Sequence, residues 1–187
     1  MGLGAWLSAY RGAPELDLAF REACGALGAE ERLAGFSVEG RQLRAYEVGP
    51  RDGVPILLTS LVHGVEVVGA LTLLEVVRRL AGDAAARIRE RARLVVLPIV
   101  NPDAHAANMD RLARGHRAWR RGNARGVDLN RNFPVTGSGR SWHPFSGSRF
   151  RLAPHYAGPH ELSEPESRTV HDVARALPPA VSLSFHS

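Results

Sequence analysis

The sequence predicts an α/β fold with a mixed, mostly parallel sheet flanked by helices. Three observations predict it. Two apolar runs of strand length, residues 56–62 and 180–185, close at His63 and His186. A third run, residues 94–100, and helical-period segments complete the alternation of strand and helix that is typical of such a sheet. Ligands bind beyond the carboxyl ends of parallel strands, where both histidines are expected.

The first part of the chain is expected to form a helix and two strands. Residues 15–27 read as a helix that ends at Gly28. Residues 36–48 read as two strands around a Glu39-Gly40 turn. The Arg-Asp-Gly turn at residues 51–53 then precedes the buried strand 56–62.

Two further helices are expected. Apolar residues at helical spacing follow His63, and Gly82 stops that helix. The last helix is predicted to begin with a capping box, Ser163-Glu164-Pro165-Glu166, with proline in its first turn. The buried stripes of these two helices are Val67, Ala70, Leu71, Leu74, Val77 and Leu80, and Val170, Val173, Ala174 and Leu177.

Residues 101–159 differ from the rest of the chain. They are rich in Gly, Pro, Asn, Arg and His and show no sustained period, which predicts a long functional loop region. Within it, residues 101–103 are a turn signal, and residues 142–145 favour a packed loop over a cleft wall. The histidines other than His63 and His186 are expected in loops or on a helix surface, without a metal.

Composition limits the class of protein. The 187 residues are predicted to form a single domain, residues 1–187. All 24 basic residues are arginine and the net charge is +5. They are scattered and aromatic residues are few, so no nucleic-acid partner is expected. Cys24, the only cysteine, excludes an internal disulfide and fits a reducing compartment. Neither a signal peptide nor a membrane span is evident, so we expect a cytoplasmic protein without membrane contact.

His63 and Glu66 form a His-x-x-Glu pair at a strand-to-helix junction, where both side chains can turn to one side. Gly64 is expected to permit the tight backbone turn between them. With the remote His186, this is the ligand set of an open catalytic zinc site, which has three protein ligands and a fourth position for water. The alternative is a helix N-terminus whose first-turn Glu66 complements the helix dipole.

Residues 126–133, Gly-Val-Asp-Leu-Asn-Arg-Asn-Phe, would make a poor core strand. Asn130 and Arg131 offer amide and guanidinium donors that suit a planar carboxylate. Asp128 is suited to accept a hydrogen bond from a ligand imidazole and to fix its tautomer. The alternative is a polar loop that bonds its own backbone.

A pair of arginines precedes this block. Arg120 and Arg121 follow Trp119, and an arginine near the zinc site is suited to polarise a substrate carbonyl and stabilise its oxyanion. A solvated basic loop is the alternative interpretation.

Five segments in order resemble the zinc carboxypeptidase superfamily, the carboxypeptidase A-like fold: HGVE at 63–66, NPDA at 101–104, NARGVDLNRNFP at 123–134, YAGPHELSEPES at 156–167 and FHS at 185–187. The resemblance covers the chain from about residue 55 to its end, and five ordered motifs are specific where each alone would be weak. The NARGVDLNRNFP block is most similar to bacterial members that cleave cell-wall peptides, the murein-peptide amidases.

The resemblance implies a zinc-dependent metallocarboxypeptidase or peptide amidase. Its substrate would be a peptide or cell-wall peptide, cleaved at the amide bond next to a free C-terminal carboxylate. One Zn²⁺ per chain would be held by His63, Glu66 and His186. Asn130 and Arg131 would form the clamp on the carboxylate of the substrate.

The resemblance also implies that Asp128 orients His63 and that one arginine holds the oxyanion. Counting back from the NARG sequence favours Arg121, whereas counting from Trp119 favours Arg120.

The chain departs from the family pattern at its end. In the family, a glutamate base and a mobile substrate-binding tyrosine lie well beyond the third ligand, and this chain ends one residue after His186. Glu161, Glu164 and Glu166 belong to the helix-start motif and do not match the base. We therefore expect a domain that is incomplete at its C-terminus, without its general base, with little activity on its own and with an open sheet edge.

Two other functions remain open. The related enzyme class is a deacylase of N-acyl amino acids, similar to aspartoacylase and succinylglutamate desuccinylase. The different class is a non-catalytic homologue that binds zinc or a peptide carboxylate, keeping the ligands and the clamp without the base. Turnover separates the enzymes from the binder.

Overall fold

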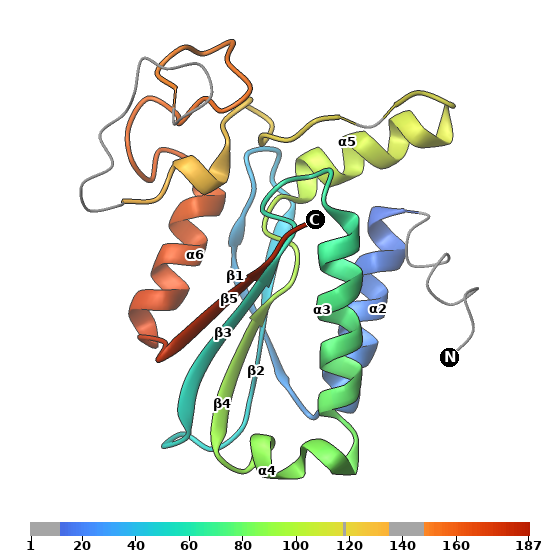
Figure 1. Ribbon diagram of the computed structural model, residues 1–187, viewed down its shortest axis with the longest axis vertical. Helices are drawn as coiled ribbons and strands as arrows, with labels where there is room; N and C mark the ends of the chain where they lie inside the picture. The colour runs from blue at the N-terminus through green and yellow to red at the C-terminus, as the bar shows by residue number, and fades with distance from the viewer. Residues whose placement is uncertain (1–11, 118, 135–147) are drawn as a thin grey trace.

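The computed structural model describes residues 12–117, 119–134 and 148–187 (Figure 1). The first eleven residues and the 142–145 segment lie outside these ranges, and so do the sequence predictions for them. The elements in chain order are α2 (Ala13–Ala26), β1 (Glu30–Phe36), β2 (Gln42–Val48), β3 (Val54–Ser60), α3 (Val67–Leu80), η1 (Asp83–Ala85), α4 (Ala86–Arg89), β4 (Ala92–Leu97), α5 (Pro102–Ala113), η2 (Leu129–Arg131), α6 (Pro165–Ala176) and β5 (Val181–Phe185).

The five strands form one mixed sheet in the order β1-β2-β4-β3-β5. β3 runs parallel to both of its neighbours, β4 and β5, whereas β2 is antiparallel to β1 and β4. The carboxyl ends of β3, β4 and β5 therefore meet at one edge of the sheet. The predicted α/β fold class is confirmed, although the first strand begins at Glu30 rather than near Phe36.

Helices cover both faces of the sheet (Figure 1). α2 and α3 pack on one face, and their buried side chains, among them Phe20 and Leu74, form the main core with β3 and β4. α6 lies on the other face, where Val173 packs against Leu57 and Val95. No helix in the described ranges is long and apolar enough to cross a bilayer.

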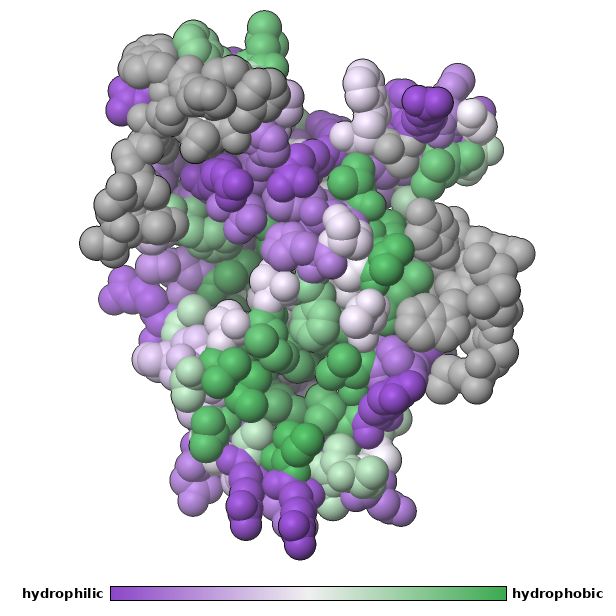
Figure 2. All heavy atoms as spheres, viewed as in Figure 1, coloured by the Kyte–Doolittle hydropathy of each residue, from purple (hydrophilic) through white to green (hydrophobic). Residues whose placement is uncertain are grey.

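The edge strand β5 pairs with β3 on one side only among the described strands. Its residues Val181 and Leu183 are 44% and 48% exposed. Figure 2 shows apolar side chains gathered over the lower half of this face, where β5, β3 and α3 lie. The expected open edge is thus present in the described sheet.

The expectation of a loop directly after β4 is wrong. Residues Pro102–Ala113 form helix α5, which Asn101 caps by accepting a hydrogen bond from the backbone N–H of Ala104 at 3.2 Å. The buried positions of α5 include Asp103, His105 and Asn108, so the helix shows no apolar period in the sequence. Asn101 followed by proline was the readable signal, because it places a capping side chain before proline in the first turn.

The predicted capping box is also wrong. The residue that precedes α6 is Glu164, and no side chain caps the helix. Ser163 donates its hydroxyl to the Glu164 carboxylate at 2.8 Å instead. Glu166 is buried and accepts from the backbone N–H of Val38 at 3.0 Å, and burial raises the pKa of its carboxyl group. The carboxylates of Glu164 and Glu166 therefore bind other residues, Ser163 and the distant Val38, and do not cap the helix.

Candidate metal centre

His63 lies just beyond the carboxyl end of β3. Leu61 has φ of 50°, a left-handed conformation that is unusual for a non-glycine residue and that turns the chain out of the strand. The turn is fixed to the end of β4, because the backbone N–H of Asn101 donates to the carbonyl of Leu61 at 2.9 Å. The imidazole of His63 is fully buried.

Gly64 has a different role from the one expected. Its φ is not in the left-handed region, so the turn does not need the freedom of glycine. A Cβ atom added at Gly64 would instead lie 2.4 Å from the Cβ of Ala104 on α5. Glycine is required here because the backbone after His63 packs directly against α5.

The side chains of His63, Glu66 and His186 converge. One ligand atom of each lies within 4.8 Å of the others. The Nδ1 of His186 lies 2.6 Å from Oε2 of Glu66, and the two imidazole rings are 5.2 Å apart. Glu66 directly precedes α3 but makes no capping bond, and its carboxylate contacts the two histidines instead.

His63 presents one nitrogen to the cluster. Its Nε2 lies 2.9 Å from Oδ1 of Asp128, so the other nitrogen, Nδ1, is the one that faces Glu66. Nδ1 is 2.9 Å from Oε1 of Glu66 but makes no hydrogen bond and has no other partner among the described residues. A buried nitrogen next to a carboxylate and a second imidazole has the chemistry of a zinc ligand set, so these residues fit the metal.

Asp128 is fully buried and shared by several donors. Besides His63 it contacts His155, whose Nδ1 lies 3.0 Å from Oδ2, and Arg121, whose Nε donates to Oδ2 at 3.2 Å. Burial alone would raise the pKa of Asp128, but the bonds from His63 and His155 and the charge of Arg121 hold it well below its usual range. Asp128 is therefore an anion at any relevant pH.

The end of β5 brings His186 to the cluster. In the parallel ladder Ser60 of β3 lies opposite Phe185, so the residues that follow the two strands are neighbours. Gly69 of α3 faces this point, and a Cβ there would lie 2.7 Å from the carbonyl oxygen of Phe185. The missing side chain allows α3, which begins next to Glu66, to approach the chain just before His186.

The two candidate arginines face different surroundings. Arg121 reaches the cluster, with Nη1 3.5 Å from Oε1 of Glu66 in addition to its bond to Asp128. Arg120 donates to the carbonyl of Ala124 at 2.8 Å and lines a separate groove on the side of α5. The structure thus brings Arg121, and not Arg120, to the metal cluster.

Asn130 and Arg131 lie in η2, immediately after Asp128, and both are exposed. The backbone N–H of Asn130 donates to Oδ1 of Asp128 at 3.1 Å, which ties the start of η2 to the residue that holds His63. Among the described residues, the Arg131 guanidinium bonds to the carbonyl of Asn130, at 3.3 Å. Both side chains are thus accessible to a ligand from solvent, beside the cluster.

Two buried asparagines that the sequence reading did not assign support this loop. Asn132 donates to the carbonyls of Ala157 and His160, both at 2.9 Å, and so holds η2 against the segment before α6. Asn123 donates to the carboxylates of Glu164 and Glu166 at 2.8 and 3.0 Å. These bonds join residues 25 to 43 positions apart, which no local pattern reveals.

The remaining histidines divide into two cases. His155 lies in a turn outside the ligand set, as expected, but its ring contacts Asp128 directly. His105 was expected in a loop or on a helix surface, yet it is fully buried within α5. Its position in α5 was hidden because that helix itself was not predicted.

Known proteins share this architecture. A model of the zinc carboxypeptidase family matches residues 30–187. The carboxypeptidase A of Helicoverpa armigera superposes with a TM-score of 0.77 at 24% identity, over 94% of this chain and 45% of that chain. A metallo-carboxypeptidase from Burkholderia cenocepacia gives a TM-score of 0.66 at 20% identity, over 93% of this chain and 40% of that chain.

Curated proteins agree with the family match. The zinc carboxypeptidase of Simulium vittatum is 29% identical over 167 residues, which are 84% of this chain and 53% of that protein. The catalytic chain of carboxypeptidase N from Mus musculus is 30% identical over 170 residues, which are 81% of this chain and 36% of that protein. The chain thus spans about half or less of the length of these relatives, and it belongs to the zinc carboxypeptidase family.

Proposed function

We propose that this chain forms the metal-binding part of a zinc metallocarboxypeptidase that hydrolyses the amide bond next to a free C-terminal carboxylate of a peptide. The observation that carries the proposal is the convergence of His63, Glu66 and His186, with Nδ1 of His63 buried and without a hydrogen bond. The family match and the names of the relatives favour this activity over the deacylation of N-acyl amino acids.

The three side chains would hold one zinc ion through Nδ1 of His63, the carboxylate of Glu66 and an imidazole nitrogen of His186. Zinc bound there would supply a Lewis acid that polarises a carbonyl and makes water more acidic. The hydrogen bond between Asp128 and Nε2 of His63 supports the assignment of Nδ1, because it fixes the tautomer and the ring orientation of the ligand.

Arg121 is proposed as the residue that stabilises the oxyanion of the substrate. Its guanidinium is held by Asp128 and lies 3.5 Å from Glu66, so it is positioned without needing the substrate. A preorganised cation beside the metal ligands is what developing negative charge on a carbonyl oxygen requires. Arg120 is not proposed for this role because it bonds to Ala124 on the other side.

Asn130 and Arg131 are proposed as the clamp on the terminal carboxylate. Their exposure beside Asp128, and the lack of an acidic partner for Arg131 among the described residues, support this role. A guanidinium and an amide offer several donors in a geometry that matches a carboxylate.

A general base would complete the reaction. The carboxylates among the described residues that contact the cluster are Glu66, proposed as a ligand, and Asp128, which is occupied by His63, His155 and Arg121. The expectation that the 187 residues alone have little activity therefore stays a prediction. The narrower expectations of a cell-wall peptide as substrate and of a cytoplasmic location also stay predictions, testable with murein peptides and by fractionation of source cells.

The proposal is tested by zinc content and peptide binding. We expect one zinc per chain by elemental analysis, and none after His63→Ala or Glu66→Ala, whereas His116→Ala, an exposed histidine, should keep its zinc. Short peptides with a free C-terminus should bind, and amidation of that terminus should weaken binding. Arg131→Ala should remove the difference between the free and the amidated peptide.

Unchanged zinc in both ligand variants would refute the metal site, and equal binding of the two peptides by the wild-type chain would refute the clamp. Turnover of the same peptides by the native protein from source cells then separates the functions. Hydrolysis supports the carboxypeptidase, whereas zinc and peptide binding without hydrolysis would replace it with the non-catalytic binder.

A further inference from the structure

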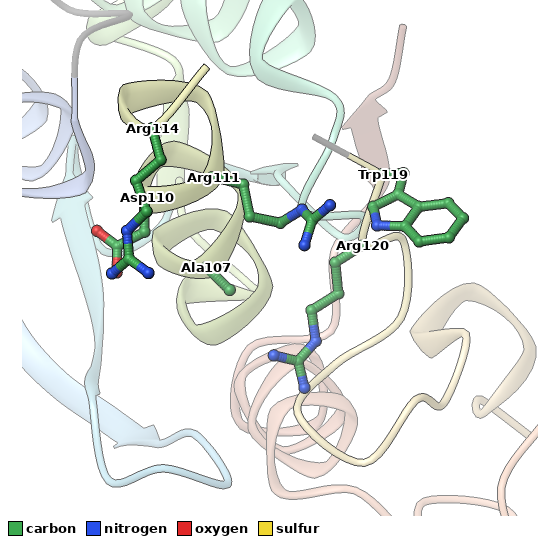
Figure 3. A pocket seen from close by; sticks show the side chains of 6 residues that line it. All are labelled: Ala107, Asp110, Arg111, Arg114, Trp119 and Arg120. Atoms are coloured by element: carbon green, nitrogen blue, oxygen red, sulfur yellow. The ribbon is translucent and has the colours of Figure 1, made fainter. Parts of the chain in front are cut away.

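A groove separate from the metal centre lies between helix α5 and the chain segment 119–120, and has a volume of about 480 Å³ (Figure 3). In Figure 3 the side chain of Arg111 extends from α5 toward Trp119, and that of Arg120 extends from the neighbouring segment along the helix. The side chains that line the groove are Ala107, Asp110, Arg111, Arg114, Trp119 and Arg120. Neither the metal ligands nor the proposed carboxylate clamp belong to it.

The segment that forms one wall is fixed to the helix that forms the other. Asn108 of α5 is fully buried, and its Oδ1 accepts from the backbone N–H groups of Trp119 and Arg120 at 3.2 and 2.9 Å. Its Nδ2 donates to the carbonyl of Arg120 at 2.9 Å. These three hydrogen bonds of one buried side chain fix the segment relative to the helix. The groove therefore has a defined shape before a ligand binds, and binding does not cost the entropy of ordering its walls.

The charge of the groove is mostly uncompensated. The lining contains three guanidinium groups and one carboxylate, that of Asp110, which lies on the same side of α5 as Arg114 (Figure 3). Arg111 donates to the carbonyl of Arg117 and Arg120 to that of Ala124, and both acceptors are neutral. Arg114 has no side-chain partner among the described residues. The groove is therefore a site of positive potential, and guanidinium groups bind carboxylate and phosphate oxygens in particular.

Trp119 adds an apolar surface. Trp119 is 75% exposed, and the guanidinium of Arg111 lies above its ring, 5.9 Å from the ring centroid. An exposed tryptophan that a cation and a backbone clamp hold in place is typical of a binding surface, where tryptophan and arginine contribute most of the binding energy. The ligand expected here combines an anionic group with apolar or planar surface, as an acidic peptide does.

The groove and the metal centre are two sides of one short segment. Arg120 faces the groove and Arg121 faces the cluster, and consecutive Cα atoms are about 3.8 Å apart. The proposed clamp in η2 is tied to the same centre, because Asp128 accepts from both the backbone N–H of Asn130 and the guanidinium of Arg121. A peptide whose terminal carboxylate is held at η2 and whose preceding residues extend past Arg121 reaches the groove.

We propose that this groove binds acidic side chains of the peptide substrate, on the N-terminal side of the bond to be cleaved. The proposal rests on the proposed function, since the direction of the peptide depends on the clamp at Asn130 and Arg131. Arg111, Arg114 and Arg120 would then make the chain bind acidic peptides more tightly than neutral ones, a selectivity that the metal centre does not itself provide.

The test compares two dye-labelled hexapeptides with the same free C-terminal residue, one with glutamate and one with glutamine at the three positions before the penultimate residue. Binding to the zinc-loaded chain is measured by fluorescence anisotropy at low ionic strength. We expect the glutamate peptide to bind about fivefold more tightly than the glutamine peptide, because a few exposed ion pairs contribute little more than that. Arg114→Gln should reduce this ratio of affinities to about twofold or less. Arg114 is chosen because its side chain makes no bond that the fold needs.

The control is Arg87→Gln, which removes the same charge from an exposed position of α4 at the far end of the sheet. It should keep the preference of the wild-type chain. Equal binding of the two peptides by the wild-type chain, or the same loss in both variants, would overturn the proposal. Five millimolar phosphate at matched ionic strength should leave the preference largely intact; if it abolishes the preference, the groove is a general oxyanion site and the peptide assignment fails.

Amidated versions of both peptides separate this proposal from the proposed function. If amidation weakens binding but glutamate and glutamine peptides bind equally, the clamp stands and the groove assignment fails. If amidation has no effect while the Arg114-dependent preference for glutamate persists, the groove binds acidic peptides but the proposed function fails, and with it the inferred peptide direction.

Discussion

At the scale of single residues, Asp128 connects the metal cluster to its surroundings. One buried carboxylate accepts from the imidazoles of His63 and His155, from the guanidinium of Arg121 and from the backbone N–H of Asn130. Its negative charge keeps the proton on Nε2 of His63 and leaves Nδ1 free for the metal. The charge also holds Arg121 beside Glu66, so one side chain positions both the proposed ligand and the proposed oxyanion residue.

Asp128→Asn should therefore weaken zinc binding by about 10- to 100-fold, since partners that orient a metal ligand typically contribute that much. Competition with a chromophoric chelator measures the affinity. His155→Gln removes one partner but leaves the Asp128 charge, so it should cost less than tenfold. An Asp128→Asn variant with the affinity of the wild-type chain would show that Asp128 does not orient the ligand.

His105 makes stability depend on pH. Burial lowers its pKa from 6.5 to about 4, and a backbone hydrogen bond with Gly64 opposes this shift only in part. Between pH 6.5 and 4 the unfolded chain takes up a proton that the folded chain does not. The free energy of unfolding therefore falls as the pH drops from 6.5 toward 4, by up to about 1.4 kcal/mol per pH unit. Above pH 6.5 the histidine is neutral in both states and this loss is absent.

Urea unfolding at pH 7, 5.5 and 4.5 tests this dependence. In His105→Phe the free energy of unfolding should fall less steeply with decreasing pH than in the wild-type chain. His116→Gln replaces an exposed histidine and should keep the steep dependence. Parallel pH profiles for His105→Phe and the wild-type chain would refute the role of His105.

At the scale of elements, two glycines let helices approach the ends of the strands. Gly64 allows the chain after β3 to touch α5, and Gly69 allows α3 to touch the end of β5. Both contacts lie next to a proposed zinc ligand. The spacing of helix and sheet therefore sets the distances within the cluster.

Gly69→Ala should lower zinc affinity about 5- to 100-fold, because overpacking typically costs about 1–3 kcal/mol and the backbone of Phe185 must move, which displaces His186. The new Cβ would lie 2.7 Å from the carbonyl oxygen of Phe185. Gly25→Ala in α2 is the matched control: no atom lies within 4 Å of its added Cβ, so zinc affinity should not change. Isothermal titration with zinc measures both, and equal affinities would contradict the packing argument.

At the scale of the whole molecule, the sheet has an unpaired edge along β5. Val181 and Leu183 are half exposed there, and the outer backbone groups of β5 have no neighbouring strand among the described elements. Such an edge pairs readily with another strand. The 187-residue chain should therefore self-associate with increasing concentration, as sedimentation velocity would show.

Leu183→Lys places a charge on that edge and should reduce self-association several-fold without unfolding the chain, because the side chain is 48% exposed. Circular dichroism checks the fold. Ile88→Lys, an equally exposed apolar position on α4, should leave self-association unchanged. A monomeric wild-type chain at all concentrations would contradict the prediction.

The sequence by itself determined strands β2 to β5, the helices with apolar periods and the residues of the metal cluster, because these depend on local periodicity and on short motifs. It did not determine β1, which begins at Glu30 rather than near Phe36. His63 and His186 were both predictable as residues at strand ends, which a parallel sheet brings to one edge. Helix α5 escaped prediction because polar side chains such as Asp103 and Asn108 fill its buried face, and their partners are distant in the chain.

Only the tertiary structure decided which arginine faces the cluster, which carboxylates of the Ser163–Glu166 segment hold other elements, and that His155 contacts Asp128. Each of these depends on bonds between residues tens of positions apart. Adjacent residues such as Arg120 and Arg121 have the same chemistry, so local sequence cannot separate them. Their direction is set by Asn108, Asn101 and Gly64, which hold the backbone of the segment, and that constraint exists only once α5 has packed against the chain after β3.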